Sequence, residues 1–266
     1  MKIFISADIE GVTGVTTWEE TDLKKPESST ACAQMTAEVA AACEGALQAG
    51  ATDLWVKDAH DTGTNLIASR LPREARLSRA WGPSPFIMLE ELDDTFQGIV
   101  LIGYHSRAGA NTSPLAHTLT GNIDTLRVND RDASEFLLST YIAAMLKVPV
   151  CFVSGDKGLC DEATQLNPRI ETVAVKEGIG SSTVSIHPDV AVDRIRAGVA
   201  KALKGNREQY LVPLPEHFSV EIRYRHHFRA YRYSFYPGAK KKDARTITFD
   251  TDNFYEVMRM FLFVVQ

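Results

Sequence analysis

The sequence lacks the features of a membrane protein, a nucleic-acid-binding protein or a disulfide-bonded secreted protein. None of its apolar runs is long enough to cross a bilayer, and the chain opens directly into a strand-like segment without a basic leader. Its net charge of −5 excludes nucleic acid as the main partner, because phosphate binding needs a basic face. No C-x-x-C spacing occurs among the four cysteines, which are Cys32, Cys43, Cys151 and Cys160. We therefore expect buried free thiols and a cytoplasmic protein that has neither membrane nor nucleic acid as a partner.

The sequence does have a hydrophobic content of 44% in 266 residues, which is enough for a large core without disulfides. Over the first two-thirds of the chain, short apolar runs alternate with helical patterns. Strands are expected at 2–7, 52–57, 98–104 and 149–154, with a further extended segment within 118–129. Helices are expected at 28–50, at 65–71, in a stretch ending at Leu92 and at 134–147. This order predicts an α/β fold, a three-layer α/β/α domain with a mostly parallel central sheet.

Potential metal ligands stand at the ends of three of these strands. Asp8 and Glu10 follow the first strand and point to one face, where two carboxylates repel each other unless a cation or a proton lies between them. His60 and His105 follow two other strands, and the carboxyl ends of parallel strands line one crevice. Glu135 opens the helix expected at 134–147. This set of nitrogen and oxygen ligands suits zinc better than manganese or cobalt, and five ligands favour two metals that share a bridging carboxylate.

Each of these residues has a simpler explanation when taken alone. Asp8 and Glu10 could be polar residues leaving a strand, and His60 could be an exposed turn histidine. Glu135 could belong to a variant of the capping box and only cap its helix. His105 is harder to explain in this way because it directly follows a buried strand. Together the simpler explanations weaken, since independent accidents rarely all fall at strand ends.

Four further residues carry groups that could support such a site. His117 is either a surface loop histidine or an acid/base residue beside the metals. Asp156 either orients a ligand histidine or caps the helix that follows it. His226 and His227 are expected in a basic, tyrosine-rich strand, where adjacent side chains point to opposite faces, so we do not expect them to form a metal pair.

The pattern of the chain changes near residue 176. A loop is expected at 178–182 and an amphipathic helix at 188–206, followed by exposed or edge strands at 219–224 and 245–250 and a closing helix at 253–264. We therefore expect residues 1–175 to form the metal-binding catalytic α/β core, and residues 176–266 to form a C-terminal α+β subdomain or oligomerisation arm. One continuous domain is the alternative.

A known family shares the candidate ligands and their surroundings. The matching segments are 8–14 (Asp-Ile-Glu-Gly-Val-Thr-Gly), 58–60 (Asp-Ala-His), 92–96, 103–108 (Gly-Tyr-His-Ser-Arg-Ala), 116–118 (Ala-His-Thr) and 128–135. Any one segment is weakly specific, but their order and spacing resemble those of the zinc-dependent D-aminopeptidases of the DppA type. The similarity runs through the whole chain.

This resemblance implies a two-zinc site and a set of residue roles. The implied metal ligands are Asp8, Glu10, His60, His105 and Glu135, with Asp8 as the bridge and His117 as the catalytic histidine. The resemblance also implies a homodecamer of two stacked five-membered rings, with active sites facing an inner chamber that admits short peptides. Lys57 stands where the family pattern has asparagine, and such departures beside the metals bear on substrate preference.

The expected function is that of a metallo-aminopeptidase, a hydrolase that cleaves the N-terminal peptide bond of short peptides containing D-amino acids such as D-Ala. Zinc would activate a water molecule, with a histidine assisting. One alternative is a dinuclear metal hydrolase that acts on another amide or on a phosphoester. The other is a non-catalytic, ring-forming scaffold that binds peptides.

Overall fold

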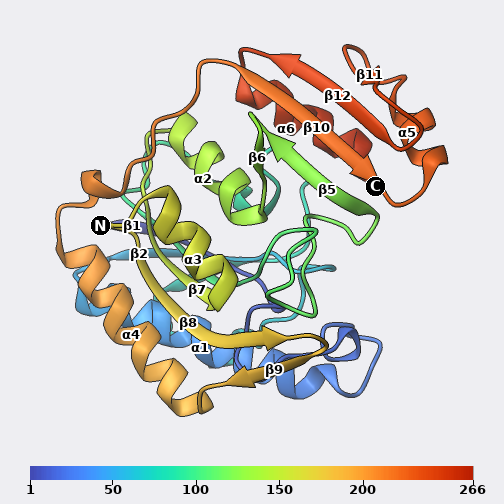
Figure 1. Ribbon diagram of the computed structural model, residues 1–266. Coiled ribbons are helices and arrows are strands. Elements are labelled where there is room, and N and C mark those ends of the chain that lie inside the picture. Colours follow the sequence, from blue (N-terminus) through green and yellow to red (C-terminus); the bar gives the residue numbers. More distant parts are fainter. Residues whose placement is uncertain (266) are drawn as a thin grey trace.

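Two β-sheets of different kinds organise the chain, as the computed structural model of residues 1–265 shows (Figure 1). The larger sheet has seven strands in the order β3-β2-β1-β4-β7-β8-β9, and only β9 runs antiparallel to its neighbour. Its strands are β1 (Lys2–Ala7), β2 (Asp53–Asp58), β3 (Ala75–Ser78), β4 (Ile99–Tyr104), β7 (Val150–Asp156), β8 (Glu171–Ile179) and β9 (Ser182–Ser185).

The central strands of this sheet are buried along almost their whole length, as expected for parallel strands covered on both faces. Their apolar, often β-branched residues read as continuous runs for the same reason. The register matters for function because Ala7 of β1 pairs with Asp58 of β2 and with Ile102 of β4. These three strands therefore end close to one another at one edge of the sheet.

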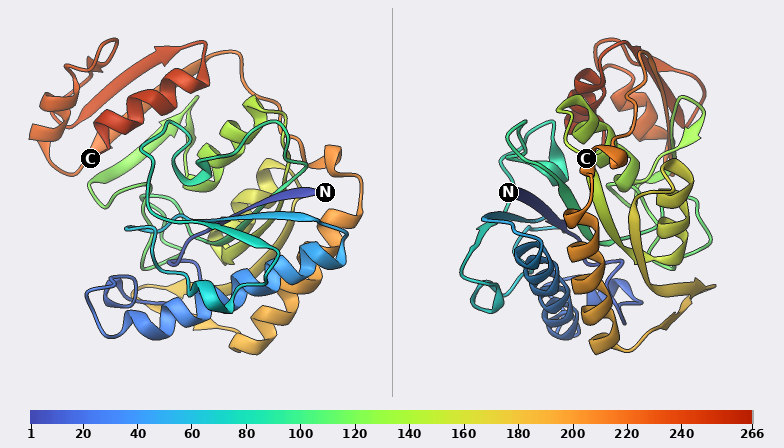
Figure 2. Two further views of the ribbon diagram at one scale, coloured as in Figure 1. Left: turned by 180° about the vertical axis from the view of Figure 1, so that it is seen from behind. Right: turned by 90° about the vertical axis from the view of Figure 1, so that its left-hand side faces the viewer.

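Helices cover both faces of the larger sheet, which confirms the predicted three-layer core. α1 (Ser28–Gln48) and α4 (Pro188–Lys204) pack side by side on one face, while α2 (Glu135–Met145) and α3 (Lys157–Leu166) lie on the other (Figure 2). Gly45 permits the close packing of α1 on α4, because a Cβ atom there would lie 2.4 Å from the carbonyl oxygen of Arg196. The connections also contain four 3-10 helices, η1 (Trp18–Glu20), η2 (Ala68–Arg70), η3 (Ile87–Leu89) and η4 (Arg207–Tyr210).

The smaller sheet is antiparallel and confirms the predicted C-terminal α+β unit. Its order is β11 (Lys240–Lys241), β12 (Thr246–Thr251), β10 (Phe218–Tyr224), β5 (Ile123–Val128) and β6 (Arg131–Asp132). The alternating burial of β10 shows one face turned to a core. α5 (His227–Tyr233) and α6 (Phe254–Val264) pack against this sheet, and α6 also contacts α2 of the larger unit.

Several expectations for single elements were wrong. β10 and β12 are interior strands of the smaller sheet, because β5 from the middle of the chain pairs with β10 and covers its edge. Of the loop expected at 178–182, only residues 180–181 form a turn, and the others belong to the strands of the β8–β9 hairpin. His226 and His227 lie at the start of a helix, α5, and not in a strand. The helices expected at 65–71 and up to Leu92 are only the single turns η2 and η3, and the sequence patterns missed β3 and α3.

The two units are not consecutive in sequence, because each contains segments from both sides of residue 175. The division expected after residue 175 falls inside β8, and β5 and β6 from before that point belong to the smaller sheet. Gln266, the last residue of the expected C-terminal unit, lies outside the described residues. All four cysteines are buried and free, as expected. No helix within residues 1–265 is long and apolar enough to span a bilayer.

Candidate metal centre

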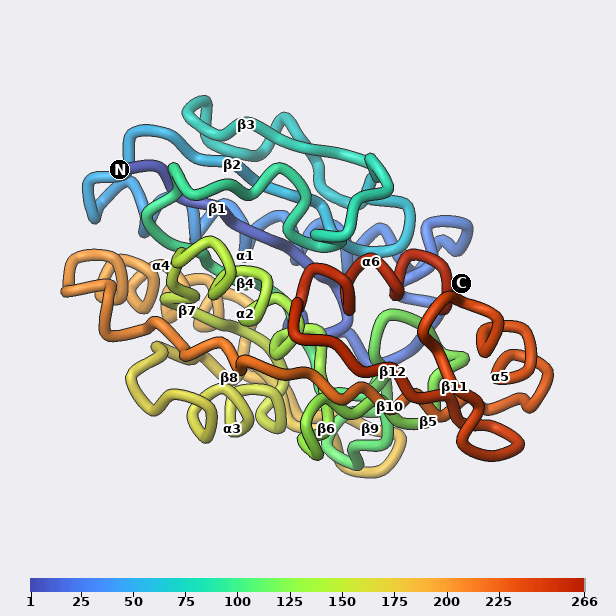
Figure 3. Tube along the Cα trace, turned by 90° about the horizontal axis from the view of Figure 1, so that it is seen from above, coloured from blue at the N-terminus to red at the C-terminus, as the bar shows by residue number. Residues whose placement is uncertain are grey.

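A cavity of about 740 Å³ opens at the edge of the larger sheet where β1, β2 and β4 end. The segments after β1 and β2, the start of α2 and the last turn of α6 all line it. In the view from above, the smaller unit, in red, lies toward the end of the larger sheet to which β1 runs (Figure 3). The smaller unit therefore supplies one wall of a cavity whose polar floor belongs to the larger sheet.

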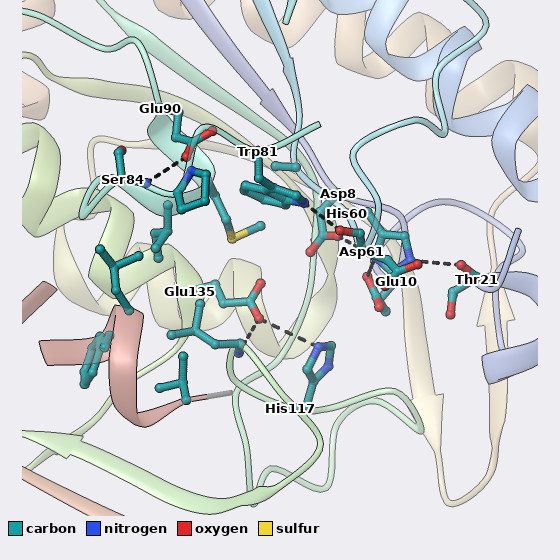
Figure 4. A pocket seen from close by; sticks show the side chains of 18 of the residues that line it. Asp8, Glu10, Thr21, His60, Asp61, Trp81, Ser84, Glu90, His117 and Glu135 are labelled. Carbon is teal, nitrogen blue, oxygen red and sulfur yellow. Dashed lines mark hydrogen bonds and ion pairs between the residues drawn. The ribbon is translucent and has the colours of Figure 1, made fainter. Parts of the chain in front are cut away.

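The first group of polar atoms consists of Asp8, Glu10 and His60. His60 Nδ1 lies 3.3 Å from Asp8 Oδ1 and 3.0 Å from Glu10 Oε2. His60 Nε2 lies 2.9 Å from the carbonyl oxygen of Thr21, which can only accept, so this nitrogen carries the ring proton. In the neutral ring, Nδ1 therefore points a lone pair at two carboxylates. Figure 4 shows this group at one end of the cavity.

The second group uses the other oxygen of Asp8. His105 Nε2 lies 3.4 Å from Asp8 Oδ2 and 3.3 Å from Glu135 Oε2. Its Nδ1 lies 2.9 Å from the carbonyl oxygen of Ser106 and donates to it, so Nε2 presents a lone pair to the carboxylates. Asp8 thus contributes one oxygen to each group, which is the arrangement of a bridging carboxylate.

The spacing of the ligand-type atoms within each group suits a cation bound between them. In tetrahedral zinc coordination with bonds of about 2.0 Å, neighbouring ligand atoms lie about 3.3 Å apart. The four distances within the groups are 3.0–3.4 Å. Within residues 1–265, Glu10 Oε2 and His105 Nε2 are buried without a hydrogen-bond partner, which is costly for polar atoms unless something else binds them. Asp8, Glu10 and His105 also have ligand atoms within 4.8 Å of one another, as do His105, His117 and Glu135.

The electrostatics of the protein atoms point the same way. Burial, with the neighbouring charge of Glu10, raises the pKa of Asp8 well above its usual value. Burial alone would lower the pKa values of His60 and His105, but the charges of Glu10 and Glu135 respectively raise them well above normal. The site therefore holds protons between its carboxylates wherever it holds no other cation. Bound metal would displace these protons, as metals do at such sites.

His117 lies beside the second group. Its ring stacks on that of His105 with centroids 4.3 Å apart, and Trp18 packs edge-on against it at 5.3 Å. Its Nδ1 donates to the carbonyl oxygen of Leu115 at 2.9 Å, which leaves Nε2 as an acceptor 3.8 Å from Glu135 Oε1. Burial and the neighbouring His105 lower the pKa of His117. His117 is therefore a neutral imidazole with a lone pair at the cavity wall.

The structure bears on the alternatives considered for Asp156, Glu135 and the two histidines of α5. Asp156 caps α3, because its Oδ1 accepts from the backbone N–H of Leu159, and its Oδ2 accepts from the backbone N–H of Ser106 at 2.7 Å. Ser106 in turn supplies the carbonyl that orients His105. Glu135 is not the cap of α2, since Ser134 is, and its side chain lines the cavity. His226 and His227 are exposed on α5 and line no part of the cavity.

Sequence patterns missed several residues that shape the site. Lys176, buried on β8, donates from Nζ to the carbonyl oxygens of Glu10 and Val15 and so holds the segment that carries the first carboxylates. Burial lowers its pKa to about 8. Trp81 lines the cavity from the segment between β3 and β4, which carries none of the candidate ligands. No sequence pattern marked Lys176, because β8 also carries the charged residues Glu171 and Glu177, and nothing marked Trp81.

Comparisons with known proteins identify the family of the chain. A family model described as peptidase M55, D-aminopeptidase, matches residues 1–263. The D-aminopeptidase of Bacillus subtilis (strain 168) is 30% identical over 268 residues, which cover 100% of this chain and 97% of that protein. A solved structure, the Zn-dependent D-aminopeptidase DppA from Bacillus subtilis, described as a self-compartmentalizing protease, superposes with a TM-score of 0.92 at 29% identity, covering 100% of this chain and 97% of the other. The chain therefore belongs to the M55 family of D-aminopeptidases, which are peptide hydrolases.

Proposed function

We propose that this protein is a two-zinc aminopeptidase that removes the N-terminal residue from short peptides containing D-amino acids such as D-Ala. The observation that carries the proposal is the position of Asp8, whose two oxygens face two separate groups of ligand-type atoms. Membership of the D-aminopeptidase family and the zinc dependence of the solved relative support the same reading.

The residues present would hold two metal ions. Asp8, Glu10 and His60 would hold one zinc, and Asp8, His105 and Glu135 would hold the other. Zinc bound there supplies Lewis acidity and lowers the pKa of a bound water toward neutral. The backbone carbonyls of Thr21 and Ser106 keep the two histidines in the tautomers that ligation requires.

His117 would act as the general base and then as the general acid of the reaction. Because its Nδ1–H is engaged with Leu115, its Nε2 can take a proton from the attacking water and pass it to the leaving amine. A lowered pKa keeps this nitrogen unprotonated at neutral pH and ready to accept. Until it has taken up this proton, Nε2 of His117 carries a lone pair and cannot donate a hydrogen bond to the oxyanion.

A test of the site compares His105→Ala with a histidine outside it. We expect zinc-loaded wild-type protein to release D-Ala from D-Ala-D-Ala, and His105→Ala and chelated wild type to lose this activity. His226→Ala, changed at an exposed position on α5, should retain full activity. Activity of the chelated protein or of His105→Ala equal to that of wild type would refute the proposal. Turnover of a phosphodiester instead of the peptide would favour another hydrolase, and peptide binding without turnover would favour a scaffold.

We propose further that the protein assembles into a homo-oligomer, a decamer of two five-membered rings, with residues from 176 onward contributing the contacts. The solved relative is self-compartmentalizing. Large apolar side chains of the smaller unit are exposed in the single chain, namely Phe228, Tyr231, Phe235 and Phe263, and assembly would cover them. Light scattering after size-exclusion chromatography tests the size. Free thiols throughout the described chain support a cytoplasmic location.

A further inference from the structure

One wall of the cavity comes from the segment between β3 and β4. Trp81, Pro83, Ser84 and Ile87 of this segment line the cavity. Figure 4 shows Trp81 across the cavity from His117 and Glu135. None of these four side chains is a candidate metal ligand, so their contribution is to the shape of the space that a substrate enters.

A buried ion pair fixes the backbone of this wall. Lys57 Nζ lies 2.9 Å from Glu90 Oε2, and the two side chains are only 1% and 3% exposed. Glu90 Oε2 accepts from the backbone N–H of Gly82 at 2.9 Å, and Oε1 accepts from that of Ser84 at 3.0 Å. Lys57 also donates to the carbonyl oxygen of Ala80 at 2.5 Å. One pair of charges therefore anchors the chain on both sides of Trp81.

The indole of Trp81 is held as firmly as its backbone. Its Nε1–H donates to the carbonyl oxygen of Asp61 at 2.6 Å, and Lys57 Nζ lies 4.8 Å from the ring centroid. Ala80, directly before it, has a φ of 60°, and Ile87 has a φ of 40°, which is a rare conformation for a β-branched residue. Such strain persists only where the surroundings enforce it, and it concentrates at ligand-contacting positions. Trp81 is nevertheless 36% exposed, and it lines the cavity.

We infer that Trp81 is a specificity-determining residue whose indole contacts an apolar side chain of the peptide substrate, with Lys57 and Glu90 as its positioning residues. This inference rests on the proposed function. Besides Trp81, the apolar side chains of Ile87, Met88, Phe261 and Val265 line the cavity, so an apolar group of a substrate could find apolar contacts there. A cavity of about 740 Å³ is also far larger than a dipeptide of two alanines requires. The site is therefore built for peptides with a large, uncharged side chain.

The experiment compares three peptides, D-Ala-D-Ala, D-Ala-D-Phe and D-Phe-D-Ala, on zinc-loaded protein. Wild type should prefer at least one aromatic peptide over D-Ala-D-Ala in kcat/KM. Trp81→Ala should reduce this preference about tenfold or more, mainly through KM, because the lost contact is a binding contact. Lys57→Met should also reduce the preference for the aromatic peptide. Trp55→Ala, the same substitution outside the cavity, should leave the ratio unchanged, since a ratio of two substrates does not depend on the folded fraction.

Each outcome decides one point. If wild type shows no preference for either aromatic peptide, or if Trp81→Ala keeps the wild-type preference within twofold, the inference is wrong. If only Lys57→Met keeps it, the positioning role of the ion pair is wrong. If wild type hydrolyses none of the peptides, the proposed function fails instead. Trp81 is then judged from the dissociation constants of the same peptides, measured by calorimetry on zinc-loaded wild type and Trp81→Ala, with the same tenfold criterion.

Discussion

The ion pair between Lys57 and Glu90 predicts a large effect on stability. Lys57→Met keeps the length of the side chain but leaves the Glu90 carboxylate buried without its cation, at 3% exposure. Removing one partner of a buried pair costs about 3–5 kcal/mol, because the remaining charge is desolvated and uncompensated. At roughly 2–4 °C per kcal/mol for a chain of this size, the melting temperature should fall by about 6–20 °C.

The double variant Lys57→Met/Glu90→Gln separates the buried charge from the loss of packing. It should recover more than half of the lost stability, because no ion remains in the interior. Lys201→Met is the matched control, since Lys201 pairs with Glu171 at 2.7 Å but its side chain is 72% exposed, so its melting temperature should equal that of wild type. The measurement is calorimetry of the metal-loaded proteins. A double variant no more stable than Lys57→Met alone would refute the reasoning.

The remaining predictions concern the site and one carboxyl group outside it. Asp8→Asn should lower the zinc content measured by metal analysis more than Glu10→Gln does, because only Asp8 faces both groups of ligand atoms; equal losses would contradict the bridging role. His117→Ala should keep its zinc but lose activity by about 10²–10⁴-fold, and loss of zinc in this variant would point to a ligand instead. Burial raises the pKa of Glu162 to about 7, so the folded state holds a proton there that the unfolded state releases near pH 4.5. Wild type should therefore lose up to about 3 kcal/mol of stability relative to Glu162→Gln as the pH rises from 4.5 through 7, with no further change above that pH. Denaturant unfolding of both proteins across this range measures the difference, and parallel curves would contradict it.

The core of the site could be predicted because its signals are local. Asp8, His60 and His105 each follow a strand that is apolar enough to be recognised, and the parallel ends of these strands bring them together. Glu135 could be proposed because it opens a recognisable helix, although its direction into the cavity depends on tertiary packing. The tautomers of the two histidines could not be predicted, since they are set by backbone carbonyls that no sequence pattern marks.

The position of β10 in its sheet and the wall that carries Trp81 could not be predicted, because both depend on pairings between segments distant in sequence. β10 was expected at an edge because its neighbour, β5, lies about 90 residues earlier in the chain and had no pattern that linked the two. The wall that carries Trp81 was missed for a similar reason, because Lys57 and Glu90 are 33 positions apart and each alone resembles a surface charge. Tertiary context, and not local propensity, decides both cases.

Because β1, β2 and β4 end at one edge of the sheet, the order of folding and metal binding is constrained. The candidate ligands are spread from residue 8 to residue 135, and they meet only once these three strands have paired. A metal ion would therefore find at most the pair Asp8 and Glu10 within one stretch of the nascent chain, unlike the ion of a zinc finger. We therefore expect metal binding to follow the pairing of these strands and to stabilise a scaffold that has already formed.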